Sequence, residues 1–305
     1  MIAPRLLHQK TESDRGRRFL AMIAMILVAF FWTVVETLAH FIPKEYSPVQ
    51  TVWSRYLVHM IFMLIVFGPQ QGVGLVRTNC LGKQISRSML MVGMPVCFVI
   101  GISLIPLRDV WTLSWTSSIM LIFMAVLILK ERVSARLWII TLVAYLGVWL
   151  MSGADIPNLR WGILAPLGMG FCYALYKIMT RTMRAENSHA NLFHTALWVF
   201  CLLTVFMPFS WKPPTISIIA IYIGIGFFGY LTLAFLDKSL ELAPAALTAP
   251  LIYTQPIWVD LFDFMINRRI PELHTVVGAT IIIAAMTCLF TLEMTGTRQL
   301  VTFEY

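Results

Sequence analysis

Charged residues are scarce in this chain. Only 12% of its 305 residues are Asp, Glu, Lys or Arg, 59% are hydrophobic, and the mean hydropathy is +0.79. Soluble domains average about 25% charged residues. The composition therefore excludes a soluble globular domain and indicates a membrane protein.

Motifs for other kinds of chemistry are missing as well. The five cysteines show neither a CxxC pattern nor metal-ligand spacing, and the sequence contains no HExxH, no GxSxG and no P-loop. We therefore expect no metal, no cofactor, no enzymatic activity and no ATP-driven transport by this chain alone. A channel is disfavoured because no pore motif repeats. The net charge of +8 lies in short segments between apolar runs, which argues against nucleic acid as a partner.

Apolar runs separated by breakers are abundant instead. A transmembrane helix needs about 20 apolar residues. The first run is too long for a signal-peptide core and is interpreted as a retained helix. The sequence thus predicts an all-α membrane protein of ten transmembrane helices, near 19–42, 49–67, 88–105, 109–129, 136–153, 161–181, 190–209, 215–236, 243–266 and 272–294. The predicted organisation is a tail at 1–18, a first five-helix repeat at 19–153, a second at 161–294 and a tail at 295–305.

The basic residues predict the orientation in a cytoplasmic (inner) membrane. If the N-terminus is cytoplasmic, sixteen of the 23 Lys and Arg residues lie on that side and six on the other, with Arg55 inside a span. The positive-inside rule then places both termini in the cytoplasm. Arg268 and Arg269 lie on the outer side and go against this trend.

The two halves of the chain align weakly with each other. A shift of 141 residues superposes Trp32 on Tyr173, Glu36 on Lys177 and Ser47 on Ser188. Because five helices per half is an odd number, the second half enters from the opposite face. This predicts an inverted repeat, in which a substrate site lies at the interface near the bilayer middle.

Three stretches resemble a known family. They are "AFFWTVVETLAHFIPKEYSPVQTVWSRYLVHMIFML", "MAVLILKERVSARLWIITLVAYLGVWLM" and "GFCYALYKIMTRTM". Their order and spacing resemble EamA-type proteins of the drug/metabolite transporter superfamily. The resemblance implies ten helices in two inverted halves around a central cavity that moves small organic metabolites. His40 departs from the family pattern, which often has a basic residue there, and Glu36 is not part of it.

Glu36 is an unexpected charge within the first apolar run. Trp32, Glu36 and His40 are spaced four apart and share one helical face. Counting from the helix ends places Glu36 and Arg55 at the same depth, about 9 Å below the outer boundary, and Trp32 level with His59. One interpretation is a permanent Glu36–Arg55 pair that pins two helices. The other is a carboxylate that faces the substrate or titrates with protons, and the histidines are further candidates for proton coupling.

Aromatic and polar residues near mid-depth complete the candidate site. The proline-broken stretch "LIYTQPIWVDLFD" is a favoured site element. Trp111 is expected to anchor at the membrane interface, and Lys177 to reach the cytoplasmic interface. The candidate substrate-binding residues are Trp32, Glu36, Arg55, His59, Trp115, Tyr173, Tyr253, Gln255 and Trp258.

The sequence predicts a secondary transporter for a small-molecule substrate. A wall of aromatic rings beside Glu36 suits amphipathic amino acids or organic amines, since ring faces attract cations. The family resemblance favours export of such a metabolite. Uptake of a quaternary amine or a nucleoside-like metabolite is the alternative.

Overall fold

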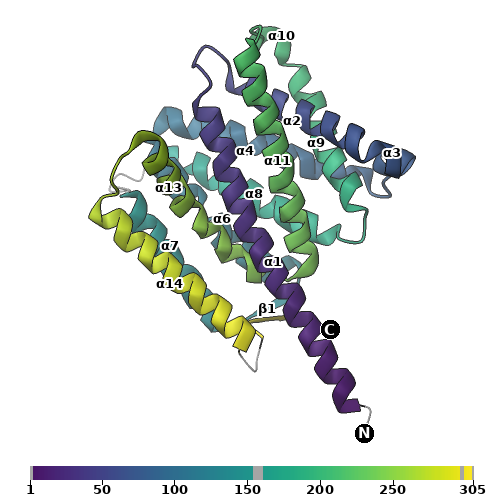
Figure 1. The fold of residues 1–305 in the computed structure, drawn as a ribbon, viewed down its shortest axis with the longest axis vertical. Coiled ribbons are helices and arrows are strands. Elements are labelled where there is room, and N and C mark those ends of the chain that lie inside the picture. The colour runs from purple at the N-terminus through teal and green to yellow at the C-terminus, as the bar shows by residue number, and fades with distance from the viewer. Residues whose placement is uncertain (1–2, 154–160, 296–298, 304–305) are drawn as a thin grey trace.

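A computed structural model describes residues 3–153, 161–295 and 299–303. This part of the chain is almost wholly helical (Figure 1). The longer helices are α1 (Ala3–His40), α2 (Pro48–Val66), α4 (Leu81–Leu104), α5 (Leu107–Ser114), α6 (Ser117–Ile128), α7 (Ala135–Ser152), α8 (Leu164–Thr182), α9 (Ser188–Thr204), α11 (Ile216–Leu242), α13 (Gln255–Asn267) and α14 (Leu273–Thr295). The short elements are α3 (Gly68–Gln71), η1 (Gly72–Leu75), β1 (Glu131–Val133), η2 (Trp161–Ile163), α10 (Met207–Ser210), α12 (Ala245–Thr248), η3 (Ala249–Thr254) and β2 (Val301–Phe303).

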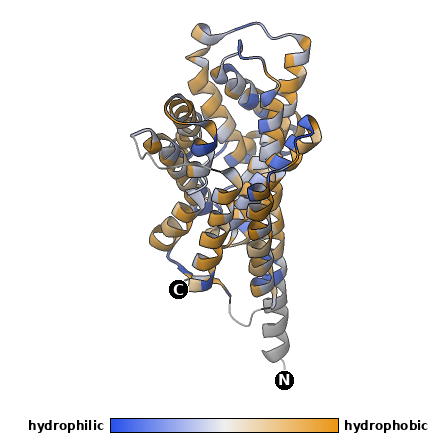
Figure 2. Ribbon diagram, turned by 90° about the vertical axis from the view of Figure 1, so that its left-hand side faces the viewer, coloured by the Kyte–Doolittle hydropathy of each residue, from blue (hydrophilic) through white to orange (hydrophobic). Residues whose placement is uncertain are grey.

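In the part of the chain that the structure describes, eight helical stretches are long and apolar enough to cross a membrane, which makes the chain a multi-pass membrane protein. They are 14–40, 48–66, 81–104, 107–128, 135–152, 161–182, 216–242 and 273–295. The predicted ranges 190–209 and 243–266 are also helical, but they hold the 17-residue α9 and a stretch interrupted before the 13-residue α13. A count of ten spans therefore stays a prediction. Figure 2 shows hydrophobic residues along most helices, which suits contact with lipid.

Local sequence signals explain where several helices begin. Ser47 and Ser134 precede α2 and α7, and each accepts a hydrogen bond from a backbone N–H in the first turn. Such caps satisfy the amide groups that a helix start leaves free. Pro48 follows its cap at the first helical position, where a proline costs no hydrogen bond. These two helix starts are thus encoded locally.

Two spans are interrupted, and both interruptions face the interior. The stretch 107–128 breaks into α5 and α6 around Trp115, whose backbone still bonds to Trp111. The stretch 245–267 passes from α12 through the 3-10 turn η3 before α13 begins at Gln255. Pro250 and Pro256 lie at the start of η3 and of α13, where their missing N–H groups are tolerated. These interruptions aim Trp115 and Gln255 at the site described below.

α1 runs between α11 and α13 (Figure 1). It packs mainly against α11, and also against η3 and α13; α4 packs against α8, and α7 against α14. Gly147 and Gly278 permit the close approach of the last pair, because a Cβ built at Gly278 would lie 2.5 Å from the Gly147 carbonyl oxygen. Small residues at such contacts are typical of helix packing in membranes.

The structure departs from an all-α fold in one place. β1 and β2 form a two-stranded antiparallel sheet in which Val133 pairs with Val301. Arg18 of α1 donates hydrogen bonds to the carboxylate of Glu293 and to the carbonyl of Val301. The end of the chain is thereby tied to the first helix and to the turn after α6. Strands of three residues are too short to show a period in the sequence.

α1 also begins earlier than the sequence predicts. Hydropathy indicates a helix from Phe19, whereas the helix already runs from Ala3. The segment before Phe19 is polar, so a search for apolar runs does not find it, but most of its residues have good helix propensity.

Candidate functional site

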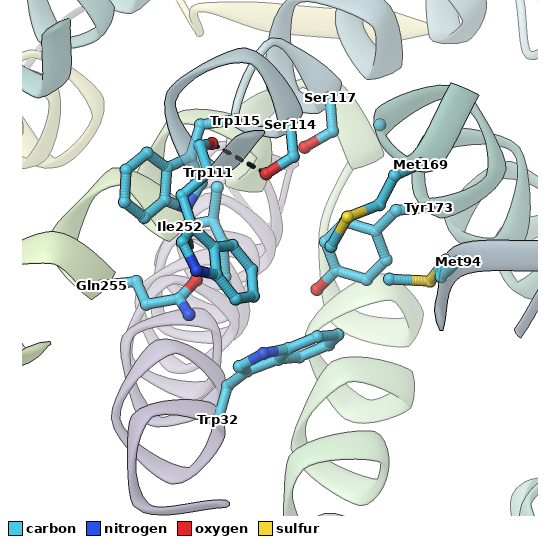
Figure 3. Close-up of a pocket in the computed structure, with 11 residues that line it drawn as sticks. Trp32, Met94, Trp111, Ser114, Trp115, Ser117, Met169, Tyr173, Ile252 and Gln255 are labelled. Atoms are coloured by element: carbon cyan, nitrogen blue, oxygen red, sulfur yellow. Dashed lines mark hydrogen bonds between the residues drawn. The ribbon is translucent and has the colours of Figure 1, made fainter. Parts of the chain in front are cut away.

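An aromatic cavity opens between α1, α4, α5, α8 and α13 (Figure 3). It encloses about 350 Å³, including the space open to solvent. Its lining residues are Trp32, Met94, Trp111, Ser114, Trp115, Ser117, Met169, Gly170, Tyr173, Ile252 and Gln255. Both halves of the sequence contribute, so residues distant along the chain converge here.

The rings of the cavity are arranged to enclose a guest. Trp32 meets Tyr173 edge to face, with centroids 5.3 Å apart. Trp111 and Trp115 lie on the opposite side, and their centroids are 6.3 Å apart. Figure 3 shows these rings around a common gap, with the sulfur atoms of Met94 and Met169 beside Tyr173. Flat rings and polarizable thioethers together form a surface that suits a planar apolar group.

A second hollow adjoins the aromatic cavity and shares four of its residues, namely Trp32, Met94, Trp111 and Met169. It encloses about 530 Å³. The residues that line this hollow alone are Val52, Arg55, Tyr56, Met91, Pro95 and Phe98. We call the two spaces together the central cavity.

A chain of hydrogen bonds runs along one wall of the central cavity. Trp32 donates from its indole nitrogen to one carboxylate oxygen of Glu36. Gln255 Nε2 donates to the other oxygen at 3.2 Å, and Trp115 Nε1 donates to Gln255 Oε1 at 3.4 Å. The chain joins α1 to α13 and to the break between α5 and α6, so it fixes two tryptophans of the cavity relative to each other.

The predicted ion pair between Glu36 and Arg55 is not formed. No oxygen of Glu36 lies within 4.0 Å of an Arg55 nitrogen, although both residues are in the described part of the chain. The prediction used only the depth of the two residues in the membrane. Depth does not determine the direction in which each side chain points around its helix axis. Glu36 turns toward α13, whereas Arg55 Cζ lies 5.9 Å from the centroid of Trp32 and 5.5 Å from that of Tyr56. The interpretation as a direct helix pin is therefore wrong for this structure.

Three other candidate residues lie outside the central cavity. Tyr253 is fully buried with its ring 6.0 Å from that of Tyr145, and Trp258 packs edge to face against Phe30. His59 is fully buried between the rings of Tyr56 and Tyr230, and neither of its ring nitrogens has a hydrogen-bond partner in the described structure. The central cavity therefore brings together Trp32, Arg55, Trp115, Tyr173 and Gln255, with Glu36 directly behind it.

Two sequence-based expectations are wrong. Trp111 lines the cavity rather than anchoring at the membrane interface. Lys177 does not reach the cytoplasm; it is fully buried, and its Nζ lies 3.9 Å from the centroid of the Tyr173 ring. Its spacing of four from Tyr173 was the available signal, since it places both side chains on one face of α8.

The burial of Arg87 was not predicted from the sequence. The count of basic residues included Arg87 among those on the cytoplasmic side, but its side chain is 0% exposed. It donates to the hydroxyl groups of Thr180 and Thr195, on α8 and α9, and lies 4.0 Å from the Asp237 carboxylate of α11. Four helices therefore meet at one guanidinium group.

Glu131 ties the first half to the start of α12. Its two carboxylate oxygens each accept a backbone hydrogen bond at 2.9 Å, from Ala245 and Ala246. Burial raises the pKa of this carboxyl, and the two backbone donors offset part of that rise. Within residues whose placement is described, no group of three His, Cys, Asp or Glu side chains is arranged to hold a metal ion.

The helical bundle and its internal cavity define a polytopic membrane transporter for small molecules. The sequence matches the EamA-like transporter family over residues 19–153 and 160–291, and the chain belongs to that family.

Curated relatives include S-adenosylmethionine uptake transporters and riboflavin transporters. An S-adenosylmethionine uptake transporter of Rickettsia prowazekii (strain Madrid E) is 22% identical over 90% of this chain and 93% of its own. Riboflavin transporters of Brucella anthropi and Vibrio cholerae serotype O1 are 23% and 21% identical, and they match 76% and 90% of this chain and 84% and 94% of their own. A crystal structure with a TM-score of 0.74 and 14% identity covers 93% of this chain and 98% of that one, which shows a shared fold.

Proposed function

We propose that this protein is a secondary transporter that carries a metabolite with a planar ring system across the cytoplasmic membrane by alternating access. The observation that carries the proposal is the central cavity, which is lined by the rings of Trp32, Trp111, Trp115 and Tyr173. Ligand pockets are commonly apolar and aromatic with a few polar groups. Here Gln255 and Arg55 supply the polar contacts.

The names of the relatives support a nucleoside-like substrate taken up by the cell. S-adenosylmethionine and riboflavin both contain a planar heterocycle, which matches the tryptophan-lined space. Uptake of such a metabolite, the alternative from the sequence, becomes the leading proposal. Export of an amino acid or organic amine remains the second candidate, favoured by the carboxylate of Glu36 beside the cavity. Proton coupling through Glu36 or His59 is part of the proposal and is tested with an imposed pH gradient.

Repeated backbone geometry supports two inverted five-helix repeats with ten spans. The residue that caps the C-terminal end of α4 is Ile105, with φ −139° and ψ 160°. The residue that caps α11 is Ala243, with φ −139° and ψ 162°. A proline follows in both places, and an interrupted helix comes next. Lys130 and Arg268, which close those two interrupted stretches, both have positive φ, 54° and 56°. The number of residues between Ile105 and Ala243 equals the number between Lys130 and Arg268, as expected of a duplicated unit.

The ties between the chain ends support an arrangement with both termini on the cytoplasmic side. Arg18 contacts Glu293 and Val301, so the beginning of the apolar part of α1 and the end of α14 lie at the same end of the bundle. The excess of basic residues there is the argument for the cytoplasm.

The proposed function is tested by exchange in liposomes. Purified protein is reconstituted, the vesicles are loaded with unlabelled compound, and counterflow of labelled S-adenosylmethionine, riboflavin or tryptophan is measured. We expect counterflow of at least one planar compound, and loss of it in Trp32→Ala and Trp111→Ala. Trp149→Ala is the matched control, because Trp149 lies on the lipid-facing side of α7 and is 39% exposed. Counterflow separates a carrier from a channel, and failure with all three compounds contradicts the proposed substrate class.

A further inference from the structure

Arg55 presents an unpaired guanidinium group to the central cavity. It lines the hollow beside the tryptophans, and its Nε atom is buried without a hydrogen-bond partner. None of its nitrogens forms a hydrogen bond or an ion pair with a residue that the structure describes. A charged group at membrane depth usually faces a partner or a water-filled cavity. Arg55 lines such a cavity, and no carboxylate among the described residues forms an ion pair with it.

The packing of α2 on α11 holds this guanidinium group in place. Gly229 of α11 leaves room for it, since a Cβ atom built there would lie 2.5 Å from Arg55 Nε and 3.2 Å from Cζ. Gly226, one turn earlier, has a similar role for the backbone, because its Cβ would lie 3.0 Å from the Arg55 carbonyl oxygen. The rings of Trp32 and Tyr56 lie within 6 Å on the cavity side. The arginine is therefore positioned before any ligand arrives.

The nearby carboxylate does not neutralise Arg55 by direct contact. Both oxygens of Glu36 are engaged by Trp32 and Gln255. The N–H groups of Arg55 are thus available to a ligand, and a guanidinium group matches the planar geometry of a carboxylate in a two-point contact.

The charge of the hollow distinguishes between a carboxylate and a phosphate. Arg55 is the one charged residue among those that line it; the others are Trp32, Val52, Tyr56, Met91, Met94, Pro95, Phe98, Trp111 and Met169. A phosphomonoester carries about −1.5 to −2 charges at neutral pH. A single arginine would leave about half a charge to one whole negative charge unbalanced in an apolar wall, whereas the single charge of a carboxylate is matched.

We infer that Arg55 binds the carboxylate of the transported metabolite while the tryptophans of the central cavity hold its planar ring. The inference rests on the proposed function and narrows its substrate class to planar metabolites that carry a carboxylate. Of the two compounds named for the relatives, S-adenosylmethionine has such a group and riboflavin does not. Arg55 then selects among ring compounds that fit the cavity equally well.

Matched ligand pairs test this role without any variant. Tryptophan and tryptamine differ only in the carboxylate and are the decisive pair. S-adenosylmethionine and methylthioadenosine share the adenosine group, but the second lacks the whole aminocarboxypropyl group and the sulfonium charge, so they form a supporting pair. Binding is measured by calorimetry on detergent-purified full-length protein. We expect the carboxylate member of at least one pair to bind about tenfold more tightly or better.

Variants then assign the preference to Arg55. In Arg55→Gln we expect affinity for the carboxylate member to fall to that of its partner, which itself changes by less than about threefold. Gly229→Ala, which pushes on the guanidinium group without removing it, should reduce the same preference. Lys83→Gln, an exposed change at the start of α4, is the charge-matched control and should have no effect.

The failures are distinguishable. If wild-type protein binds and exchanges none of the compounds, the proposed function is wrong and the inference falls with it. If ring compounds bind equally with and without the carboxylate, or if Arg55→Gln weakens both members of a pair to the same extent, the proposed function survives and the role of Arg55 is overturned.

Discussion

Trp32 and Glu36 form a hydrogen bond along one face of α1, from the indole nitrogen to the carboxylate one turn further on. Trp32 lines the central cavity, while Glu36 lies behind it and lines a separate hollow together with His40 and Asp263. Gln255 holds the second oxygen of the carboxylate. The carboxylate of Glu36 therefore fixes the orientation of Trp32 and Gln255, and both of these side chains line the cavity.

The first prediction concerns Glu36→Gln. The amide keeps the size of the side chain, but it presents an N–H₂ group to one of two donors, so one hydrogen bond to a charged group is lost. Such bonds are worth about 1.5–3 kcal/mol, and we expect counterflow to fall by about tenfold or more with a smaller effect on the melting temperature.

Arg55 supplies the comparison for that variant. Since no ion pair joins the two residues, the double variant with Arg55→Gln should transport no better than the worse single variant. Recovery of both stability and transport in the double variant would restore the helix-pin interpretation.

The second prediction concerns topology. Single cysteines are introduced at Lys83 and at Lys212 after the five native cysteines, all free, have been replaced. Lys83 is exposed, and the side chain of Lys212 is 43% exposed. We expect a membrane-impermeant maleimide to label position 83 from the cytoplasmic side and position 212 from the outer side of intact cells. Labelling of both from one side would contradict the predicted orientation.

The third prediction concerns the contact between α7 and α14. In Gly278→Ala the new methyl group meets backbone atoms, the Gly147 oxygen at 2.5 Å and the Met151 nitrogen at 2.7 Å. Backbone cannot rotate aside, so the helices must separate, at a cost of about 1–3 kcal/mol. The melting temperature in detergent should fall. Gly16→Ala is the control, because its Cβ meets no atom within 4 Å and alanine favours helix; an equal fall in both variants would argue against the close contact.

The fourth prediction concerns Arg87. Arg87→Gln leaves the Asp237 carboxylate buried without its nearby cation and removes donors to α8 and α9. Breaking one half of a buried pair costs about 3–5 kcal/mol. We expect a large fall in melting temperature and a partial recovery in the double variant with Asp237→Asn. The exposed Lys83→Gln should shift stability by less than about 0.5 kcal/mol, and no recovery in the double variant would show that the carboxylate is neutralised in another way.

Much of the fold follows from hydropathy, because a span in lipid must satisfy its own backbone and be apolar over its length. The apolar runs therefore located helices such as α2, α7 and α14 to within a few residues. The sequence did not predict the start of α1, because that segment is polar. It did not predict β1 and β2 either, because strands of three residues are too short to show a period. The pairing of Val133 with Val301 depends on the folded bundle and leaves no local trace.

For the site, spacing was informative and depth was less so. The spacing of four between Trp32 and Glu36 identified a shared face, and the structure adds the hydrogen bond between them. Depth placed Arg55 level with Glu36 but gave no information about rotation around the helix axis, so it predicted an ion pair that is not formed. Trp111 and Lys177 were assigned to interfaces for the same reason, since which neighbour covers a side chain is decided only when the helices pack.

The ion pair between Arg18 and Glu293 and the pairing of β1 with β2 have a mechanical consequence. They join the first helix, the last helix and the turn after α6 at one end of the bundle, so these contacts must break before the three parts can separate. We expect this end to be the stiffer one. Larger displacements are then expected at the opposite end, where α1 and α13 border the hollow beside Glu36.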